Sequence, residues 1–130
     1  MDQGSLVENQ IKDGARIVEA LRASGFDVVA AWWMKETEEG LWFLYVASKE
    51  VDEKGIKAAY HAIHIVMRDL GELWVDRFKV KMVGPENLIT KDVLNILAHS
   101  SGRLPPRFGG RKLGNVTIDG SYIYPPAVAV

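Results

Sequence analysis

The feature that most constrains the fold is a seven-residue apolar run, residues 28–34, that contains two adjacent tryptophans, Trp32 and Trp33. Side chains alternate between the two faces of a β-strand, so adjacent tryptophans in a strand point to opposite faces. The next apolar run, residues 41–48, is also apolar at both odd and even positions. We therefore expect two strands that are covered on both faces, either by the rest of the chain or by a partner.

Three segments have the periodicity of amphipathic helices, with apolar residues at steps of three and four. They are residues 5–24, 52–70 and 86–99. Asp52 is predicted to cap the second of these helices. Gly14 lies inside the first, where glycine costs about 1 kcal/mol relative to alanine, so we interpret it as a site of close packing.

The remaining strands are predicted from turn signals and alternation. The polar segment 36–40 predicts a hairpin between the two apolar runs, and residues 76–83 alternate as a further strand. On that strand Phe78, Val80 and Met82 share one face, and Arg77, Lys79 and Lys81 share the other. Asp119-Gly120 is typical of a type I′ turn, so residues 115–124 are predicted to form a compact C-terminal hairpin.

The predicted order is helix, strand, strand, helix, strand, helix, strand, strand. This order predicts a single α+β domain over residues 1–130, a length close to the common domain size. We expect two layers, a mixed or mostly antiparallel sheet with helices packed mainly on one face. Residues 101–114 contain four glycines and two prolines and are predicted to be an irregular loop.

Composition excludes several kinds of chemistry. The chain has no cysteine, which removes disulfides, thiolate nucleophiles and cysteine-based metal sites. The longest apolar run is far shorter than the ~20 residues that cross a bilayer, and no leader pattern is visible. We therefore expect a cytoplasmic protein without a membrane partner.

No motif predicts a catalytic, metal or cofactor-binding residue. His61 and His64 have a spacing that suits a metal, but the apolar stripe of their helix places them towards solvent, beside Lys57 and Arg68. We interpret both as surface histidines. Nucleophile elbows, phosphate-binding loops and dinucleotide fingerprints are absent from the sequence, so an enzyme is the less favoured hypothesis.

The charge is unevenly distributed, although the net charge is only −1. Residues 93–130 hold a single acid, Asp119, and four cations within the glycine-rich loop: Arg103, Arg107, Arg111 and Lys112. Arginine forks match phosphate geometry, so these four are candidate ligands for nucleic acid or another anion. The alternative is a solvated loop whose cations pair with nearby acids.

A second candidate surface is the sheet face opposite the predicted helices. It is expected to present four aromatic residues as an interface: Trp33, Trp42, Tyr122 and Tyr124. An aromatic face of this kind is what a homodimer buries. Aromatics among Arg77, Lys79 and Lys81 could instead stack nucleic-acid bases, and the loop 101–114 could simply cover them.

Several segments resemble a set of short uncharacterised bacterial proteins. They are residues 25–33, residues 44–48 before Val51-Asp52, residues 114–118, and Tyr122-Ile123-Tyr124. The resemblance implies a bacterial stand-alone domain and brings no activity or site residue with it. From the residues, the leading hypothesis is a non-catalytic interaction domain that forms a homodimer and acts through its aromatic sheet face and the basic loop. The alternative is a protein that binds nucleic acid or a phosphate ligand through residues 103–112.

Overall fold

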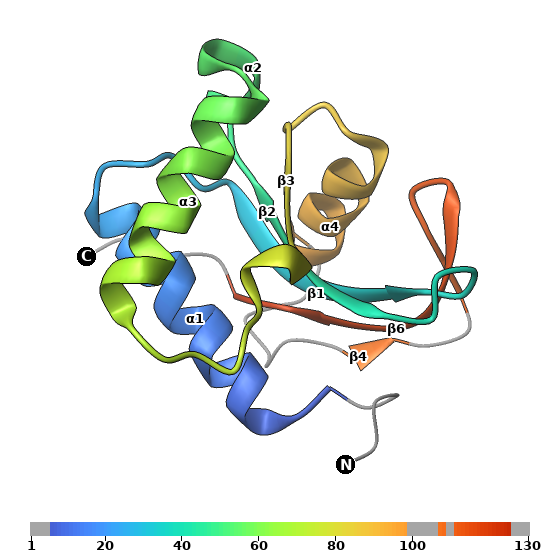
Figure 1. The fold of residues 1–130 in the computed structure, drawn as a ribbon. Helices are drawn as coiled ribbons and strands as arrows, with labels where there is room; N and C mark the ends of the chain where they lie inside the picture. Colours follow the sequence, from blue (N-terminus) through green and yellow to red (C-terminus); the bar gives the residue numbers. More distant parts are fainter. Residues whose placement is uncertain (1–5, 99–106, 109–110, 126–130) are drawn as a thin grey trace.

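A mixed β-sheet forms the centre of the molecule (Figure 1). The computed structural model describes residues 6–98, 107–108 and 111–125. The strands are β1 (Ala30–Glu36), β2 (Trp42–Ala47), β3 (Val80–Val83), β4 (Arg107–Phe108), β5 (Arg111–Leu113) and β6 (Val116–Ile123). Their order is β3-β2-β1-β6-β4, with β5 also paired to β6. Only the β2–β3 pair among these is parallel, so the predicted mixed sheet is confirmed.

Helices lie on both sides of this sheet (Figure 1). They are α1 (Glu8–Ala23), α2 (Glu50–Lys54), α3 (Ile56–Leu70) and α4 (Leu88–Ala98), with a short 3-10 turn η1 (Arg77–Lys79). The two longest helices, α1 and α3, pack on the face that carries Trp33 and Leu44. Helix α4 packs with Val93 on the face that carries Trp32. The predicted α+β architecture and the covering of both faces are confirmed.

Gly14 is a position of close approach between α1 and the sheet, as predicted. A Cβ atom there would collide with the hydroxyl of Tyr124 and would lie 3.0 Å from Nε1 of Trp33. Glycine is therefore required because α1 lies directly on these two aromatic side chains.

The predicted helix 52–70 is divided into two. Gly55 has a φ of 94°, a left-handed conformation that only glycine adopts without strain, and it separates α2 from α3. Helix α2 begins at Glu50, so the prediction that Asp52 caps the helix is wrong.

The strand predicted over residues 76–83 places Phe78, Val80 and Met82 on its inward face. This prediction is correct for Val80 and Met82, each 3% exposed, and wrong for Phe78, which is 72% exposed. The carboxylate of Asp76 accepts a hydrogen bond from the Phe78 amide at 2.9 Å, and this cap stabilises residues 77–79 as the 3-10 turn η1. Regular alternation therefore starts only at Val80.

The predicted hairpin at Asp119-Gly120 is also wrong. Strand β6 runs continuously through both residues; Lys35 pairs with Gly120 and Glu36 with Ile118, so Asp119 is the extra residue of a β-bulge. The true two-residue turn is Gly114-Asn115, between β5 and β6, where Gly114 has a φ of 62°. The pairing of β6 along β1 outweighs the local turn preference, because a hairpin at residue 119 would leave half of that edge of β1 unpaired.

Candidate functional site

The four predicted interface aromatics lie on the face that α1 and α3 cover. Trp33 is 1% exposed and Tyr124 8% exposed. Nε1 of Trp33 donates to the Tyr124 hydroxyl at 2.8 Å, and that hydroxyl donates to the Ile11 carbonyl at 2.6 Å. Trp42 and Tyr122 are partly buried against the same core. Trp33 and Tyr124 therefore belong to the interior of this chain, because their face is the one that meets the helices.

The predicted basic loop is only partly described. Arg103 lies outside the described residues, and the backbone of Arg107 pairs with Tyr122. Arg111 and Lys112 pair with Ile118 and Thr117 on the same edge of β6, and Lys112 is exposed. The fold thus brings three of the four cations to the edge of β6 away from β1; anion binding there stays a prediction.

A pocket lies elsewhere, at the C-terminal half of α3. Its volume is about 360 Å³, and we call it the cationic pocket. Its lining consists of His64, Met67, Arg68, Gly71, Leu73, Val75 and Arg77. Met67, Leu73 and Val75 supply the apolar part of the lining, and every titratable side chain of the lining is basic, so the pocket suits an anionic group.

The segment after α3 shapes this pocket. Gly71 ends the helix with a φ of 87°, and the chain turns back along α3 towards β3. Oδ2 of Asp13 in α1 accepts a hydrogen bond from the Trp74 amide at 2.7 Å. Val75 is 4% exposed and anchors the segment in the core. The wall that carries Leu73 and Val75 is therefore fixed by α1 as well as by α3.

The two arginines of the cationic pocket differ in their partners. Arg68 pairs with Asp69 at 3.3 Å, and both side chains are about two-thirds exposed or more, at 73% and 67%, so this pair is weak. Arg77 has no ion-pair partner within the described part of the chain, and its guanidinium stacks at 4.9 Å over the ring of Phe78. Arg77 thus keeps its hydrogen-bonding capacity for a ligand.

The sequence patterns do not predict this site. Alternation predicts that Phe78 faces the core, and the predicted surfaces do not include the half-exposed Trp74. The available signal was Asp76, since an Asp two residues before Phe78 predicts a side-chain-capped turn instead of a strand. Of the two predicted surface histidines, His61 is exposed and His64 lines the pocket.

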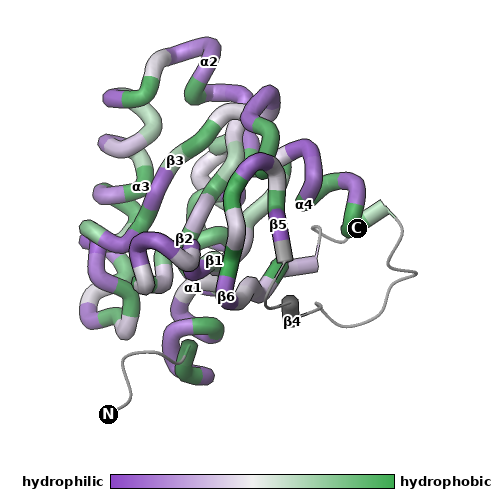
Figure 2. The backbone as a smooth tube through the Cα atoms, turned by 90° about the vertical axis from the view of Figure 1, so that its right-hand side faces the viewer, coloured by the Kyte–Doolittle hydropathy of each residue, from purple (hydrophilic) through white to green (hydrophobic). Residues whose placement is uncertain are grey.

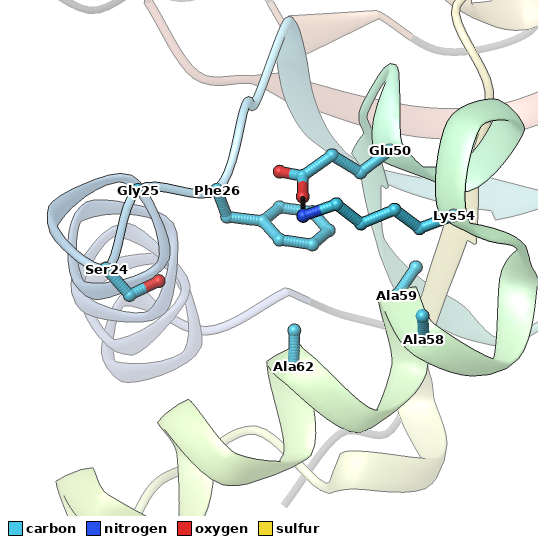
Figure 3. Close-up of a pocket in the computed structure, with 8 residues that line it drawn as sticks. All are labelled: Ser24, Gly25, Phe26, Glu50, Lys54, Ala58, Ala59 and Ala62. Carbon is cyan, nitrogen blue, oxygen red and sulfur yellow. Dashed lines mark ion pairs between the residues drawn. The ribbon is translucent and has the colours of Figure 1, made fainter.

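A second pocket, of about 240 Å³, lies between the C-terminal end of α1 and the connection of α2 to α3 (Figure 3). The carboxylate of Glu50 is its only acidic group and pairs with Lys54 at 2.8 Å. The hydrogen bond from Lys54, and then the one from the Asp27 amide, hold the pKa of Glu50 below its usual range.

A third pocket, of about 200 Å³, lies beside the turn between β5 and β6 and is lined by Glu36, Glu38, Asn115, Val116 and Thr117. Burial, followed by the hydrogen bond to Glu39, raises the pKa of Glu36. The Tyr45 hydroxyl donates to Glu36 at 3.2 Å, and Lys81 pairs with Glu39 at 3.5 Å. Across the described ranges, no three His, Cys, Asp or Glu side chains are grouped so as to hold a metal ion.

The fold and the pockets define an α+β domain with a cationic pocket on the side that α1 and α3 cover. No family model, curated protein or solved structure matches the chain. The resemblance to short bacterial proteins therefore stays a prediction. Within the part of the chain that the structure describes, no helix combines the length and hydropathy needed to cross a membrane.

Proposed function

We propose that this chain is a binding domain for a small anionic ligand, which it holds in the cationic pocket. The observation that carries the proposal is the lining of that pocket. Its only titratable groups are His64, Arg68 and Arg77, and they lie beside three apolar side chains: Met67, Leu73 and Val75. A molecule with a carboxylate or phosphate group and an apolar part is complementary to this arrangement.

The size and the chemistry of the pocket both favour binding. Its volume of about 360 Å³ falls within the range of small-molecule sites. The stacking of Arg77 on Phe78 orients the planar guanidinium, which lowers the entropic cost of a two-pronged contact with an oxyanion. The described lining offers no hydroxyl or carboxylate to act as a nucleophile, which favours a non-catalytic role.

The test is an NMR titration with phenyl phosphate, and with benzyl alcohol as a neutral probe of similar shape. We expect Arg77→Gln to weaken phenyl phosphate binding about tenfold, because it removes a charge-assisted contact, and to leave benzyl alcohol binding unchanged. Lys57→Gln, which makes the same charge change at an exposed position of α3 outside the pocket, is the matched control.

Equal losses in the Arg77 and Lys57 variants would show that only overall charge matters and would overturn the proposal. Nucleic acid is the other anion to consider. Tight binding of a single-stranded oligonucleotide that falls steeply with salt, together with no phenyl phosphate shifts at residues 64–77, would favour that alternative instead.

A further inference from the structure

The second pocket contains an ion pair, Glu50 with Lys54, in place of several cations. It lies at the elbow between α2 and α3, and we call it the elbow pocket (Figure 3). It is lined by Ser24, Gly25, Phe26, Glu50, Lys54, Ala58, Ala59 and Ala62. It shares no lining residue with the cationic pocket, so an inference about it is independent of the function proposed above.

Glu50 is a buried and fixed carboxylate at one end of the elbow pocket. The residue is 8% exposed. Its Oε2 atom accepts a hydrogen bond from the Asp27 amide at 2.7 Å, which leaves Oε1 for the pocket side. The Glu50 amide in turn donates to the hydroxyl of the buried Ser48 at 3.0 Å. The carboxylate is therefore held in place by the backbone, whatever group occupies Oε1.

Lys54 supplies the present partner of Oε1, at 2.8 Å, but its side chain is 66% exposed. Figure 3 shows this side chain extending from α2 to the Glu50 carboxylate, and it overlaps the ring of Phe26 in this view. An exposed lysine in such a pair contributes little net stability, because its ammonium is well solvated when released. The ammonium of another molecule can therefore compete for the same oxygen.

The walls of the elbow pocket suit an alkyl chain. Ala58, Ala59 and Ala62 point into it from α3, and the ring of Phe26 closes the opposite side (Figure 3). Short side chains leave space where longer ones would fill it, and methylene groups are stabilised against such apolar walls. The pocket thus combines one fixed carboxylate with apolar walls around a small volume.

We propose that the elbow pocket binds a short primary alkylammonium ion, whose ammonium replaces Nζ of Lys54 on Oε1 of Glu50. The alkyl part then lies between Phe26 and the alanines of α3. Lys54 is an internal competitor, which the incoming ammonium displaces into solvent. Because Lys54 lies in α2 and its side chain is 66% exposed, rotation of this side chain into solvent needs no change in α3.

The experiment is an NMR titration with n-butylammonium chloride that follows the Asp27 amide, since this amide is bonded to Glu50. We expect saturable shifts with the unaltered chain and none with 1-butanol. Lys54→Met removes the competitor and should tighten binding about fivefold, whereas Glu50→Gln should abolish it. Glu53→Gln, an adjacent exposed carboxylate, is the matched control and should bind as the unaltered chain does.

The two variants of the ion pair are thus expected to act in opposite directions. Unchanged or weaker binding by Lys54→Met, or equal shifts with 1-butanol, would overturn the proposal. If Glu50→Gln fails to fold, Ala58→Leu takes its place, because this exposed helical position accepts leucine while the larger side chain fills the pocket. Retained binding by Ala58→Leu would equally overturn it.

Discussion

Trp32 and Trp33 are neighbours in β1, and the two faces of the sheet hold them in different ways. Both are buried, at 0% and 1% exposed. Trp33 donates its indole N–H to Tyr124, which is bonded to the Ile11 carbonyl of α1. Trp32 stacks on Tyr45 with ring centroids 5.6 Å apart and an interplanar angle of 2°. Its Nε1 has no hydrogen-bond partner in the described part of the chain.

The difference shows how each face specifies its packing. The face of α1 and α3 uses a buried hydrogen-bond chain, which ties one helix to one position on the sheet. On the face of α4, Trp32 is held by aromatic stacking and apolar contact. Helix α4 itself is tied to the β5–β6 turn at the sheet edge, where the Asp92 carboxylate accepts a hydrogen bond from the Gly114 amide at 2.6 Å. Figure 2 shows hydrophilic and hydrophobic residues alternating along the helices that cover the sheet.

The largest expected effect is at Gly14, where α1 meets the hydrogen-bond chain. We expect Gly14→Ala to lower the free energy of unfolding by about 3 kcal/mol, because the new methyl group displaces the Tyr124 hydroxyl and breaks its bonds. Chemical denaturation measures this change. In a Tyr124→Phe background the same substitution should cost much less, since the colliding oxygen is gone; an equal cost in both backgrounds would show that Tyr124 is not responsible.

The second prediction compares the two tryptophans directly. Trp33→Phe removes the donor to Tyr124 as well as apolar volume, so we expect it to destabilise the fold by about 2–3 kcal/mol. Trp32→Phe removes a donor without a described partner and should cost about 1 kcal/mol less than Trp33→Phe. Thermal and urea unfolding of the two variants in parallel provide the test. Equal costs would mean that the polar network does not distinguish the faces.

The smallest expected effects concern two carboxylates with opposite pKa shifts. The pKa of Glu50 is lowered, first by the hydrogen bond from Lys54. Its ionised form therefore stabilises the fold at pH values above the pKa of the unfolded chain, and this stabilisation is lost as the pH falls through the pKa of the folded chain. The pKa of Glu36 is raised, first by burial, so its ionisation costs stability as pH rises through that range.

At pH 7 we therefore expect Glu50→Gln to destabilise the fold and Glu36→Gln to stabilise it. Each change should be below about 1 kcal/mol, because solvent screens these partly exposed pairs. Unfolding curves should be recorded between pH 3 and 7. The difference in the free energy of unfolding between each variant and the unaltered chain should shrink towards acid pH, where the native carboxyls are protonated. Differences of the same sign at pH 7 would contradict the assignment of opposite shifts.

The sequence predicted the elements whose signals are repeated along many residues. The first helix, the β1–β2 hairpin and the need for cover on both strand faces all depend on periodicity, and all are confirmed. The predictions that failed depended on single residues. Asp119-Gly120 is a strong turn signal, but pairing with β1 made it a bulge. Asp76 is an equally local signal, and there the turn formed at the expense of the predicted strand.

The candidate sites were the least predictable part. The cationic pocket joins residues of α3 to residues of the segment before β3, and the elbow pocket joins the end of α1 to α2 and α3. The lining residues of each pocket come from separate segments of the chain, so no sequence motif of fixed spacing marks either pocket. The cations predicted from clustering, Arg107, Arg111 and Lys112, lie instead along the edge of β6.

By itself the sequence determined that Trp32 and Trp33 would point to opposite faces of a strand and that both faces would need cover, because alternation and apolar content are local properties. Only the tertiary structure decided which face each would occupy, that Trp33 would bond to Tyr124, and that Phe78 would remain exposed beside Arg77. These outcomes depend on contacts between residues distant along the chain, and such contacts are set by how the helices and strands pack together.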